Sequence, residues 1–203
     1  LKDSVPNNKK LDVLEIGPGG GYYTNYFISK YKIKSYKAIE ISNYFAKKLN
    51  FYFAELGRNF NVINGDALEE LRKFEDKSCD IILFASTFHH LVDRDIIFKE
   101  IERILKKNGK AIFREPTHYI PRILDLLKKS FKINGYLNKK TFCNKEFIAT
   151  HHFCTTEEFS DYLENCKHLF LTKIKFHQIK NKFFKTIFRK FSAIEMMLVI
   201  TKK

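Results

Sequence analysis

Along the first 115 residues, short apolar segments alternate with longer segments whose apolar residues recur every three or four positions. The short segments predict β-strands, and the periodic segments predict amphipathic helices. The predicted strands comprise residues 11–16, 35–41, 60–63, 79–85 and 110–114. The clearest helical pattern spans residues 93–107 and stops at Asn108-Gly109, a common end for a helix. Strands and helices in this alternation are typical of an open, mostly parallel sheet.

The pattern changes after Pro116. A helical pattern follows at residues 121–131, and residues 132–150 are polar, basic and irregular. The sequence Thr155-Thr156-Glu157-Glu158 resembles a capping box and predicts another helix. Two strand-like runs, residues 169–177 and 193–201, predict an antiparallel hairpin at the sheet edge.

These elements predict an α/β, Rossmann-like fold with an open, mostly parallel seven-stranded sheet. We expect helices on both faces of the sheet and an antiparallel hairpin at the C-terminal end. A single domain is expected over residues 1–203. It would comprise a core at 10–115, a variable substrate-region insertion at 116–155, and a C-terminal helix with the edge hairpin at 156–203.

A glycine-rich turn follows the first predicted strand. Gly17, Gly19 and Gly21 stand at alternate positions, and a helical pattern begins directly after them. Glycine accepts the positive φ of a tight turn and leaves room for a ligand. The helix that follows points its first amides at that ligand. The turn alone is compatible with several classes of nucleotide ligand.

Acidic residues stand at the carboxyl ends of the first three predicted strands. Glu15 closes the first strand, Glu40 closes the second, and Asp66 follows the third. Ligands of open α/β sheets bind outside these strand ends. Glu40 follows the glycine turn at about the 20-residue spacing at which an acid binds a ribose diol. Asp66 is placed to accept a hydrogen bond from an adenine amine. Glu40 by itself would also suit NAD.

Five motifs then resemble, in order and spacing, those of the class I S-adenosylmethionine-dependent methyltransferases. The match is closest to the small-molecule group that includes the methyltransferase type 11 and quinone-biosynthesis enzymes. The motifs occupy residues 13–21, 38–42, 64–67, 79–85 with 88–91, and 100–110. The resemblance covers residues 10–115, with a looser match from Thr155 onward. It implies S-adenosylmethionine as the cofactor and S-adenosylhomocysteine as its product.

At the methionine end of such a cofactor, the resemblance implies contacts from the first and fourth motifs. Glu15 and the amides of Gly17, Gly19 and Gly21 would hold the methionine moiety. The carbonyl of Ala85 would help to fix the amino group of the ligand. The charge of Glu15 would repel a pyrophosphate but attract an ammonium, which favours S-adenosylmethionine over NAD.

At the nucleoside end, the resemblance implies contacts from the second and third motifs. Glu40 would bind the ribose hydroxyls, and Ile41 beside it belongs to the predicted cofactor-binding residues. Asp66 and Ala67 would face adenine.

Methyl transfer needs alignment of the reacting atoms and exclusion of water. A general base helps when the acceptor is a hydroxyl. His90, just past the fourth predicted strand, is the candidate for this base. The alternative is a histidine that bonds only to backbone at a helix start, and His89 fits that description better than His90.

Two absent motifs narrow the choice of acceptor. Ser86-Thr87-Phe88 stands where adenine-N6 and glutamine-amide enzymes carry an Asp/Asn-Pro-Pro-aromatic turn, and no Pro-Cys pair for pyrimidine-C5 chemistry occurs. No metal site is expected, because the histidines and cysteines near the C-terminal end follow no zinc spacing. These residues are His151, His152, Cys154, Cys166 and His168.

The net charge of +14 lies almost wholly in the second half of the chain. Residues 1–100 carry 15 Lys and Arg against 14 Asp and Glu, whereas residues 101–203 carry 22 against 9. This asymmetry favours an anionic partner. We expect a small-molecule acceptor, anionic or hydrophobic, that is selected mainly by residues 116–152. The alternatives are an RNA methyltransferase or RNA-binding relative that uses the basic half, and a relative of the same fold without catalysis.

Residues 182–191 combine aromatic and basic side chains at helical spacing. Such a segment can rest on an anionic membrane surface or bind nucleic-acid phosphates. A segment packed on the domain with its lysines in water explains the same pattern and is preferred. No apolar run approaches the roughly 20 residues that cross a bilayer, and no secretory signal opens the chain. Four cysteines without a CxxC pair suit a reducing compartment, so we expect a cytoplasmic protein.

Overall fold

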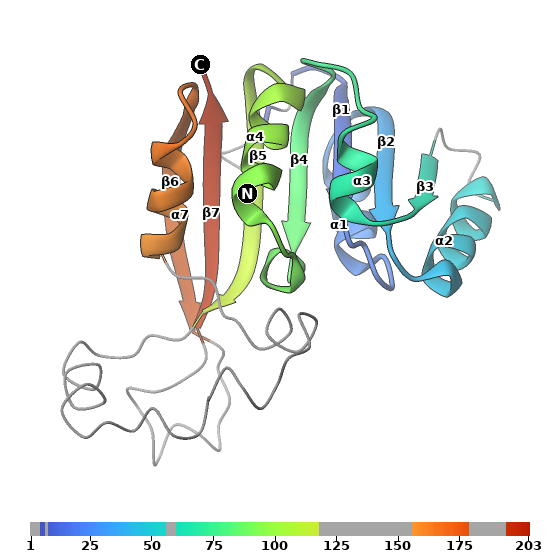
Figure 1. The fold of residues 1–203 in the computed structure, drawn as a ribbon. Helices are drawn as coiled ribbons and strands as arrows, with labels where there is room; N and C mark the ends of the chain where they lie inside the picture. Colours follow the sequence, from blue (N-terminus) through green and yellow to red (C-terminus); the bar gives the residue numbers. More distant parts are fainter. Residues whose placement is uncertain (1–4, 7, 56–59, 118–155, 179–193) are drawn as a thin grey trace, which may run out of the picture.

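The computed structural model describes residues 5–6, 8–55, 60–117, 156–178 and 194–203, which form a twisted sheet with helices on both faces (Figure 1). Its elements follow the predicted alternation of strands and helices. In chain order they are β1 (Leu11–Ile16), α1 (Tyr22–Lys30), β2 (Ile33–Glu40), α2 (Asn43–Glu55), β3 (Phe60–Asn64), α3 (Ala67–Leu71), β4 (Cys79–Ala85), the 3-10 helix η1 (Phe88–His90), α4 (Arg94–Ile104), β5 (Leu105–Thr117), α7 (Thr156–Glu164), β6 (Leu169–Gln178) and β7 (Ile194–Lys202).

The sheet has seven strands in the order β3-β2-β1-β4-β5-β7-β6. Parallel pairing joins β3, β2, β1, β4 and β5, and β7 runs antiparallel to both β5 and β6. The predicted fold class, including the antiparallel C-terminal hairpin, is therefore confirmed. The strand order reverses between β1 and β4. In open α/β sheets this reversal opens a crevice at the carboxyl ends of the strands.

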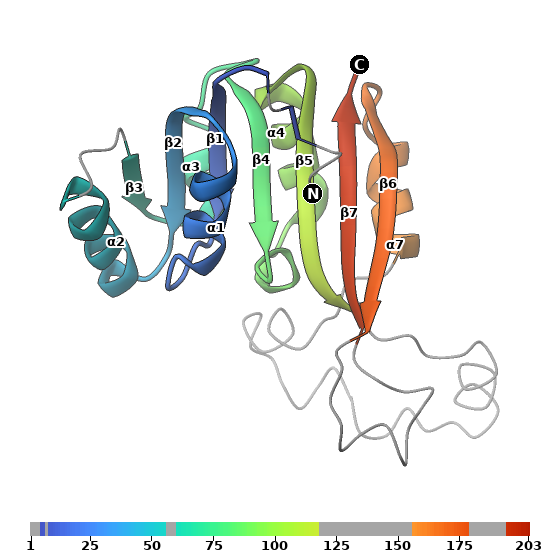
Figure 2. The same ribbon diagram turned by 180° about the vertical axis from the view of Figure 1, so that it is seen from behind.

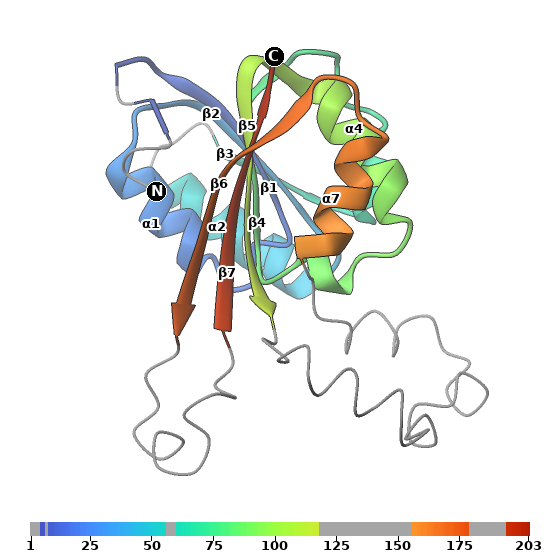
Figure 3. The ribbon, with the colours of Figure 1, turned by 90° about the vertical axis from the view of Figure 1, so that its left-hand side faces the viewer.

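Helices α3, α4 and α7 cover one face of the sheet, and α1 and α2 cover the other (Figures 2 and 3). The core beneath α4 and α7 contains a cluster of aromatic rings. The Phe113 ring of β5 lies parallel to the rings of Phe84 and Phe98 at centroid distances of 4.7 and 5.6 Å. Phe88 and Phe159 meet the same ring edge-on at 5.1 and 4.9 Å. Because Phe88 belongs to η1, this core also anchors the segment that follows β4.

The boundary between α4 and β5 differs from the sequence prediction. The helix ends at Ile104, and β5 already begins at Leu105, inside the predicted helix 93–107. The Nζ of Lys202 donates to the carbonyls of Glu102 and Leu105 at the end of the helix. Lys106 extends instead to Asp12 and Asp80, at 2.6 and 3.0 Å. These partners lie far away in the sequence, so a local helical pattern could not reveal them.

Several predictions fall outside the described residues. They concern the helical pattern at 121–131, the segment 182–191, and the side chains of His151, His152 and Cys154. The division into a core, an insertion and a C-terminal part stays a prediction. Of the helices that the structure describes, none is long and apolar enough to cross a membrane.

Candidate functional site

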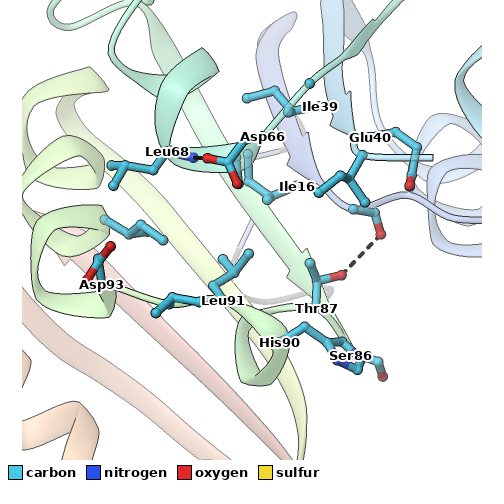
Figure 4. A pocket seen from close by; sticks show the side chains of 16 residues that line it. Ile16, Ile39, Glu40, Asp66, Leu68, Ser86, Thr87, His90, Leu91 and Asp93 are labelled. Atoms are coloured by element: carbon cyan, nitrogen blue, oxygen red, sulfur yellow. Dashed lines mark hydrogen bonds between the residues drawn. The ribbon is translucent and has the colours of Figure 1, made fainter. Parts of the chain in front are cut away.

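A cavity of about 480 Å³ opens at the carboxyl ends of β1, β2 and β4, where the strand order reverses (Figure 4). Its volume lies within the range of roughly 300–1,000 Å³ that is usual for small-molecule sites. One wall is formed by the ends of β1 and β2 and by the turn that leads into α3. The opposite wall is formed by residues between β4 and α4, together with Ile97.

Six of the predicted site residues line this cavity: Gly17, Glu40, Ile41, Asp66, Ala67 and His90. They come from four separate places along the chain, and the fold brings them together. Four other predicted residues, Glu15, Gly19, Gly21 and Ala85, are not among the lining residues. The binding roles of all ten stay predictions, but the geometry favours the first six.

The Glu40 carboxylate joins the end of β2 to the glycine turn. Its Oε2 accepts a hydrogen bond from the Gly19 amide, and its Oε1 accepts one from the Ser42 amide, both at 2.8 Å. Each carboxylate oxygen can accept a second hydrogen bond. The residue is only 5% exposed, yet it lines the cavity. Glu40 is thus held rigidly, with capacity to accept from two neighbouring hydroxyls.

Asp66 caps α3 with one oxygen and leaves the other for the cavity. Its Oδ1 accepts from the amides of Leu68 and Glu69 at 2.8 and 3.1 Å. Its Oδ2 makes no hydrogen bond to any residue that the structure describes. Because Ile41 and Leu68 provide apolar surface in the same cavity, this part of the site suits a flat heterocycle that carries an amine.

The glycine turn packs directly against the segment after β4. Gly17 has a φ of +65°, and a Cβ built there would lie 2.4 Å from Cγ2 of Thr87. The Thr87 hydroxyl also donates to the Gly17 carbonyl at 3.1 Å. Gly19 and Gly21 likewise adopt positive φ values, of +52° and +78°. The three glycines therefore allow the backbone conformation of the turn, and of the three only Gly17 lines the cavity.

Glu15 lies beneath the glycine turn rather than in the cavity. It is 1% exposed, and its Oε2 accepts hydrogen bonds from Thr24 and Tyr36 at 2.5 and 2.6 Å. Burial raises the pKa of the Glu15 carboxyl to about 7. The hydrogen bonds from Thr24 and Tyr36 lower this pKa, and the charge of Glu40 raises it by a smaller amount. This geometry does not favour the predicted contact with a methionine moiety. It makes Glu15 a support that ties β1 to α1 and β2.

Ala85 is the other predicted residue whose contact the geometry does not favour. Its carbonyl accepts a hydrogen bond from the Thr87 hydroxyl at 3.3 Å, while Ser86 and Thr87 line the cavity in its place. Directly after β4, Ser86 adopts a φ of +56°, and the chain then continues into η1.

Replacement of Glu15 by glutamine is expected to change how stability depends on pH. Glu15 titrates near 4.5 in the unfolded chain and near 7 in the folded protein. Folding therefore binds a proton between these values, and wild-type stability falls as the pH rises from 4.5 to 7. The Glu15→Gln variant has no carboxyl at this position, so its stability does not show this fall. Between about pH 4.5 and pH 8, its free energy of unfolding should gain roughly 3 kcal/mol relative to the wild type.

Urea unfolding of the wild type and of Glu15→Gln across this pH range measures the effect. A difference between the two proteins that stays constant with pH would contradict the buried, partly protonated carboxyl.

His90 is exposed and lines the cavity beside Thr87 and Leu91. Partial burial lowers the pKa of His90, as do the neighbouring His89 and, more weakly, Arg94, while the charge of Glu115 opposes them. The imidazole is therefore neutral at neutral pH, as a general base must be.

Glu115, near the end of β5, was not among the site residues predicted from the sequence. It is fully buried and accepts hydrogen bonds from the amides of Thr87 and Phe88 at 3.0 and 2.9 Å. A signal was available, because Glu115 is another acid near the carboxyl end of a strand. Thr87 and Asp93 were also missed, although both line the cavity. Neither belongs to a residue pattern that points to binding.

Among the described residues, no three or more His, Cys, Asp or Glu side chains are placed to hold a metal ion. Cys166, one of the residues considered for zinc, packs in the core beneath α7. Burial raises the pKa of the Cys166 thiol to about 11, which also makes it a poor thiolate ligand.

Comparison with known proteins identifies the domain. A family model described as a methyltransferase domain matches residues 14–113. The S-adenosylmethionine dependent methyltransferase from Mesorhizobium loti superposes with a TM-score of 0.66 at 13% identity, over 99% of this chain and 95% of that one. The chain therefore carries a methyltransferase domain at residues 14–113, with the fold of S-adenosylmethionine-dependent methyltransferases.

Other solved structures share the fold of this methyltransferase. The YcgJ protein from Bacillus subtilis is 15% identical, with a TM-score of 0.70 over 99% of this chain and 95% of its own. Phosphoethanolamine N-methyltransferase 2 from Haemonchus contortus, solved with S-adenosyl-L-methionine, is 13% identical, with a TM-score of 0.66 over 100% of this chain and 50% of its own. At such identities the likeness concerns the fold alone.

Among curated proteins, the methyltransferase is similar to one named "Probable polyketide synthase 42" from Dictyostelium discoideum. The two are 25% identical over 183 residues, which cover 77% of this chain. The chain spans about 7% of the length of that relative.

Proposed function

We propose that this methyltransferase transfers the methyl group of S-adenosylmethionine to a small-molecule acceptor, with the cofactor in the cavity at the ends of β1, β2 and β4. The observation that carries the proposal is the Glu40 carboxylate. Two backbone amides at 2.8 Å hold it in place at the cavity wall, and it retains capacity for the two hydroxyls of a ribose.

The rest of the cavity fits the same cofactor. The Oδ2 of Asp66 would accept from the amine of adenine, with Ile41 and Leu68 against the ring. Gly17 presents bare backbone where a side chain would fill the cavity and collide with Thr87. The predicted positions of ribose and adenine thus coincide with side chains that line one continuous cavity.

When bound, S-adenosylmethionine supplies a methyl group that its positive sulfur has already activated. The acceptor atom would form a bond to that methyl group while the sulfur keeps the electron pair of the breaking bond. We propose that His90 takes up the proton that the acceptor atom loses. Its neutral imidazole borders the cavity, and removal of the proton makes a hydroxyl or amine a better nucleophile.

A small-molecule acceptor is favoured by one observation. The curated relative is by its name a polyketide synthase. An anionic or hydrophobic acceptor and a cytoplasmic location stay predictions. The nucleic-acid alternative depends on the basic second half of the chain, in which residues 118–155 and 179–193 lie outside the described part.

Isothermal titration with S-adenosylmethionine and S-adenosylhomocysteine tests the cofactor site, and both ligands are expected to bind in a one-to-one ratio. Transfer of a labelled methyl group to fractionated metabolites, with total RNA in parallel, tests the acceptor class. Absence of binding of either ligand to the wild type would overturn the proposed function. Label in RNA but in no metabolite fraction would overturn the small-molecule acceptor.

Replacement of His90 by glutamine is expected to lower kcat by about 100-fold while the affinity for S-adenosylhomocysteine changes little. The wild-type kcat should be level above pH 6.5 and should fall only below it, because the pKa of His90 is lowered from that value. The control is His168→Gln, an exposed histidine outside the cavity. An unchanged kcat in His90→Gln would contradict the role of a general base.

A further inference from the structure

The segment between β4 and α4, residues 86–93, forms a strap along one wall of the cavity. Both ends of the strap have an unusual backbone. Ser86 and Asp93 adopt positive φ values of +56° and +52°, which cost energy in residues other than glycine. Such a conformation persists only when the surrounding structure holds it, and His90 enters the cavity from this strap.

The buried carboxylate of Glu115 holds the strap from below. Its Oε1 accepts hydrogen bonds from the amides of Thr87 and Phe88 at 3.0 and 2.9 Å. Its Oε2 lies 2.6 Å from Nδ1 of His89 and also accepts a longer bond, of 3.4 Å, from the His89 amide. One side chain thus satisfies the amides at the start of η1 and orients the neighbouring imidazole.

Arg94 holds the strap from the other end. Its Nη2 donates to the His89 carbonyl at 2.8 Å, and its Nε donates to the Leu91 carbonyl at 3.0 Å. The backbone on both sides of His90 is therefore fixed, and His90 lines the cavity between these two contacts.

His89 connects Glu115 to His90. The His89 ring is buried against the carboxylate, and it does not line the cavity. The rings of His89 and His90 contact each other, with centroids 3.9 Å apart at an angle of 42°. Rotation of the His90 ring is restricted by this contact, and the His89 ring is itself held by its bond to Glu115.

We propose that Glu115 and His89 are positioning residues for the methyl-transfer step, because together they hold His90 at the cavity wall. This inference rests on the proposed function, in which His90 takes up the acceptor's proton. Glu115 and His89 touch neither cofactor nor acceptor in this scheme. They act through the orientation of His90 and through the path of the strap.

A role limited to capping η1 does not account for the choice of glutamate at position 115. A serine or threonine could cap η1 without placing a charge in the core, and burial of a charge is unfavourable unless it is fully paired. In this fold the charge is paired with three amides and with the ring beside His90. Through these contacts Glu115 holds His90, the side chain of the strap that is the candidate for proton transfer.

A double-mutant cycle on the full chain tests the inference with Glu115→Gln and His90→Gln. In the wild-type background, Glu115→Gln is expected to lower kcat at least about tenfold, with S-adenosylhomocysteine affinity and acceptor KM kept within about threefold. In the His90→Gln background the same substitution should change kcat by less than about twofold. Proton NMR should also lose the low-field imidazole signal of His89 in Glu115→Gln.

Glu100→Gln is the matched control. Glu100 pairs with Arg103 on α4, outside the cavity lining, and its replacement should leave kcat unchanged. If Glu115→Gln does not fold, His89→Phe takes its place in the cycle, because phenylalanine keeps the ring but removes the bond to Glu115.

Equal losses of kcat in both backgrounds would overturn the inference, since Glu115 would then act independently of His90. A loss of S-adenosylhomocysteine affinity in Glu115→Gln with unchanged kcat would also overturn it. These outcomes differ from failure of the proposed function, in which the wild type itself binds no cofactor and transfers no methyl group.

Discussion

Replacement of Glu40 by alanine is expected to weaken S-adenosylhomocysteine binding by at least about 100-fold. The variant loses two charge-assisted hydrogen bonds to the ribose, each of which contributes roughly 1.5–3 kcal/mol. It also releases the amides of Gly19 and Ser42, which the carboxylate holds at 2.8 Å. Isothermal titration measures the affinity, and thermal unfolding shows how much of the effect comes from a less stable turn.

One further variant separates the charge of Glu40 from its shape, and another serves as a control. Glu40→Gln keeps the size of the side chain but removes the charge, so its loss should be smaller than that of the alanine variant. Glu69→Ala, an exposed residue of α3 outside the cavity lining, should bind like the wild type. Wild-type affinity in Glu40→Ala would place the cofactor elsewhere on the protein.

Replacement of Gly17 by alanine is expected to destabilise the protein and to abolish detectable binding of S-adenosylhomocysteine. At a φ of +65° an alanine costs roughly 1–2 kcal/mol. Its Cβ would also lie 2.4 Å from Cγ2 of Thr87, so the strap would have to move. Because Gly17 and Thr87 both line the cavity, this movement would deform the site itself.

Gly20→Ala is the matched control within the same turn. Gly20 is exposed, and a Cβ at this position meets no atom within 4 Å. Its φ is not among the positive values of the turn, so alanine should leave binding unchanged and keep or slightly raise stability. Similar behaviour of the two variants, measured by thermal unfolding and titration, would contradict the tight packing of Gly17 on the strap.

The cavity at the strand ends was predictable because chain order and strand ends determine much of its lining. Parallel strands bring their carboxyl ends to one edge, so Glu40 and Asp66 had to lie near the glycine turn. The direction of each side chain was harder to predict. Successive residues of a strand face opposite sides of the sheet, and Ile16 lines the cavity whereas Glu15 does not.

Long-range contacts explain the remaining differences between prediction and structure. The end of α4 depends on Lys202, almost a hundred residues away, which donates to the last carbonyls of the helix. The strap that carries His90 depends on Glu115 of β5, which accepts hydrogen bonds from the amides of Thr87 and Phe88. Neither contact produces a periodic pattern in the sequence, because each joins one side chain to residues that lie far away along the chain.

By itself the sequence determined the order of strands and helices, the glycine turn, and the acids at the ends of the first three strands. These features are local, since periodicity and the conformational freedom of glycine act over a few residues. Only the tertiary structure decided which of those residues face the cavity, and that Glu15 lies beneath it. It also decided that Glu115 and His89 hold His90, because pairing between distant strands and side-chain direction arise only when the whole sheet is assembled.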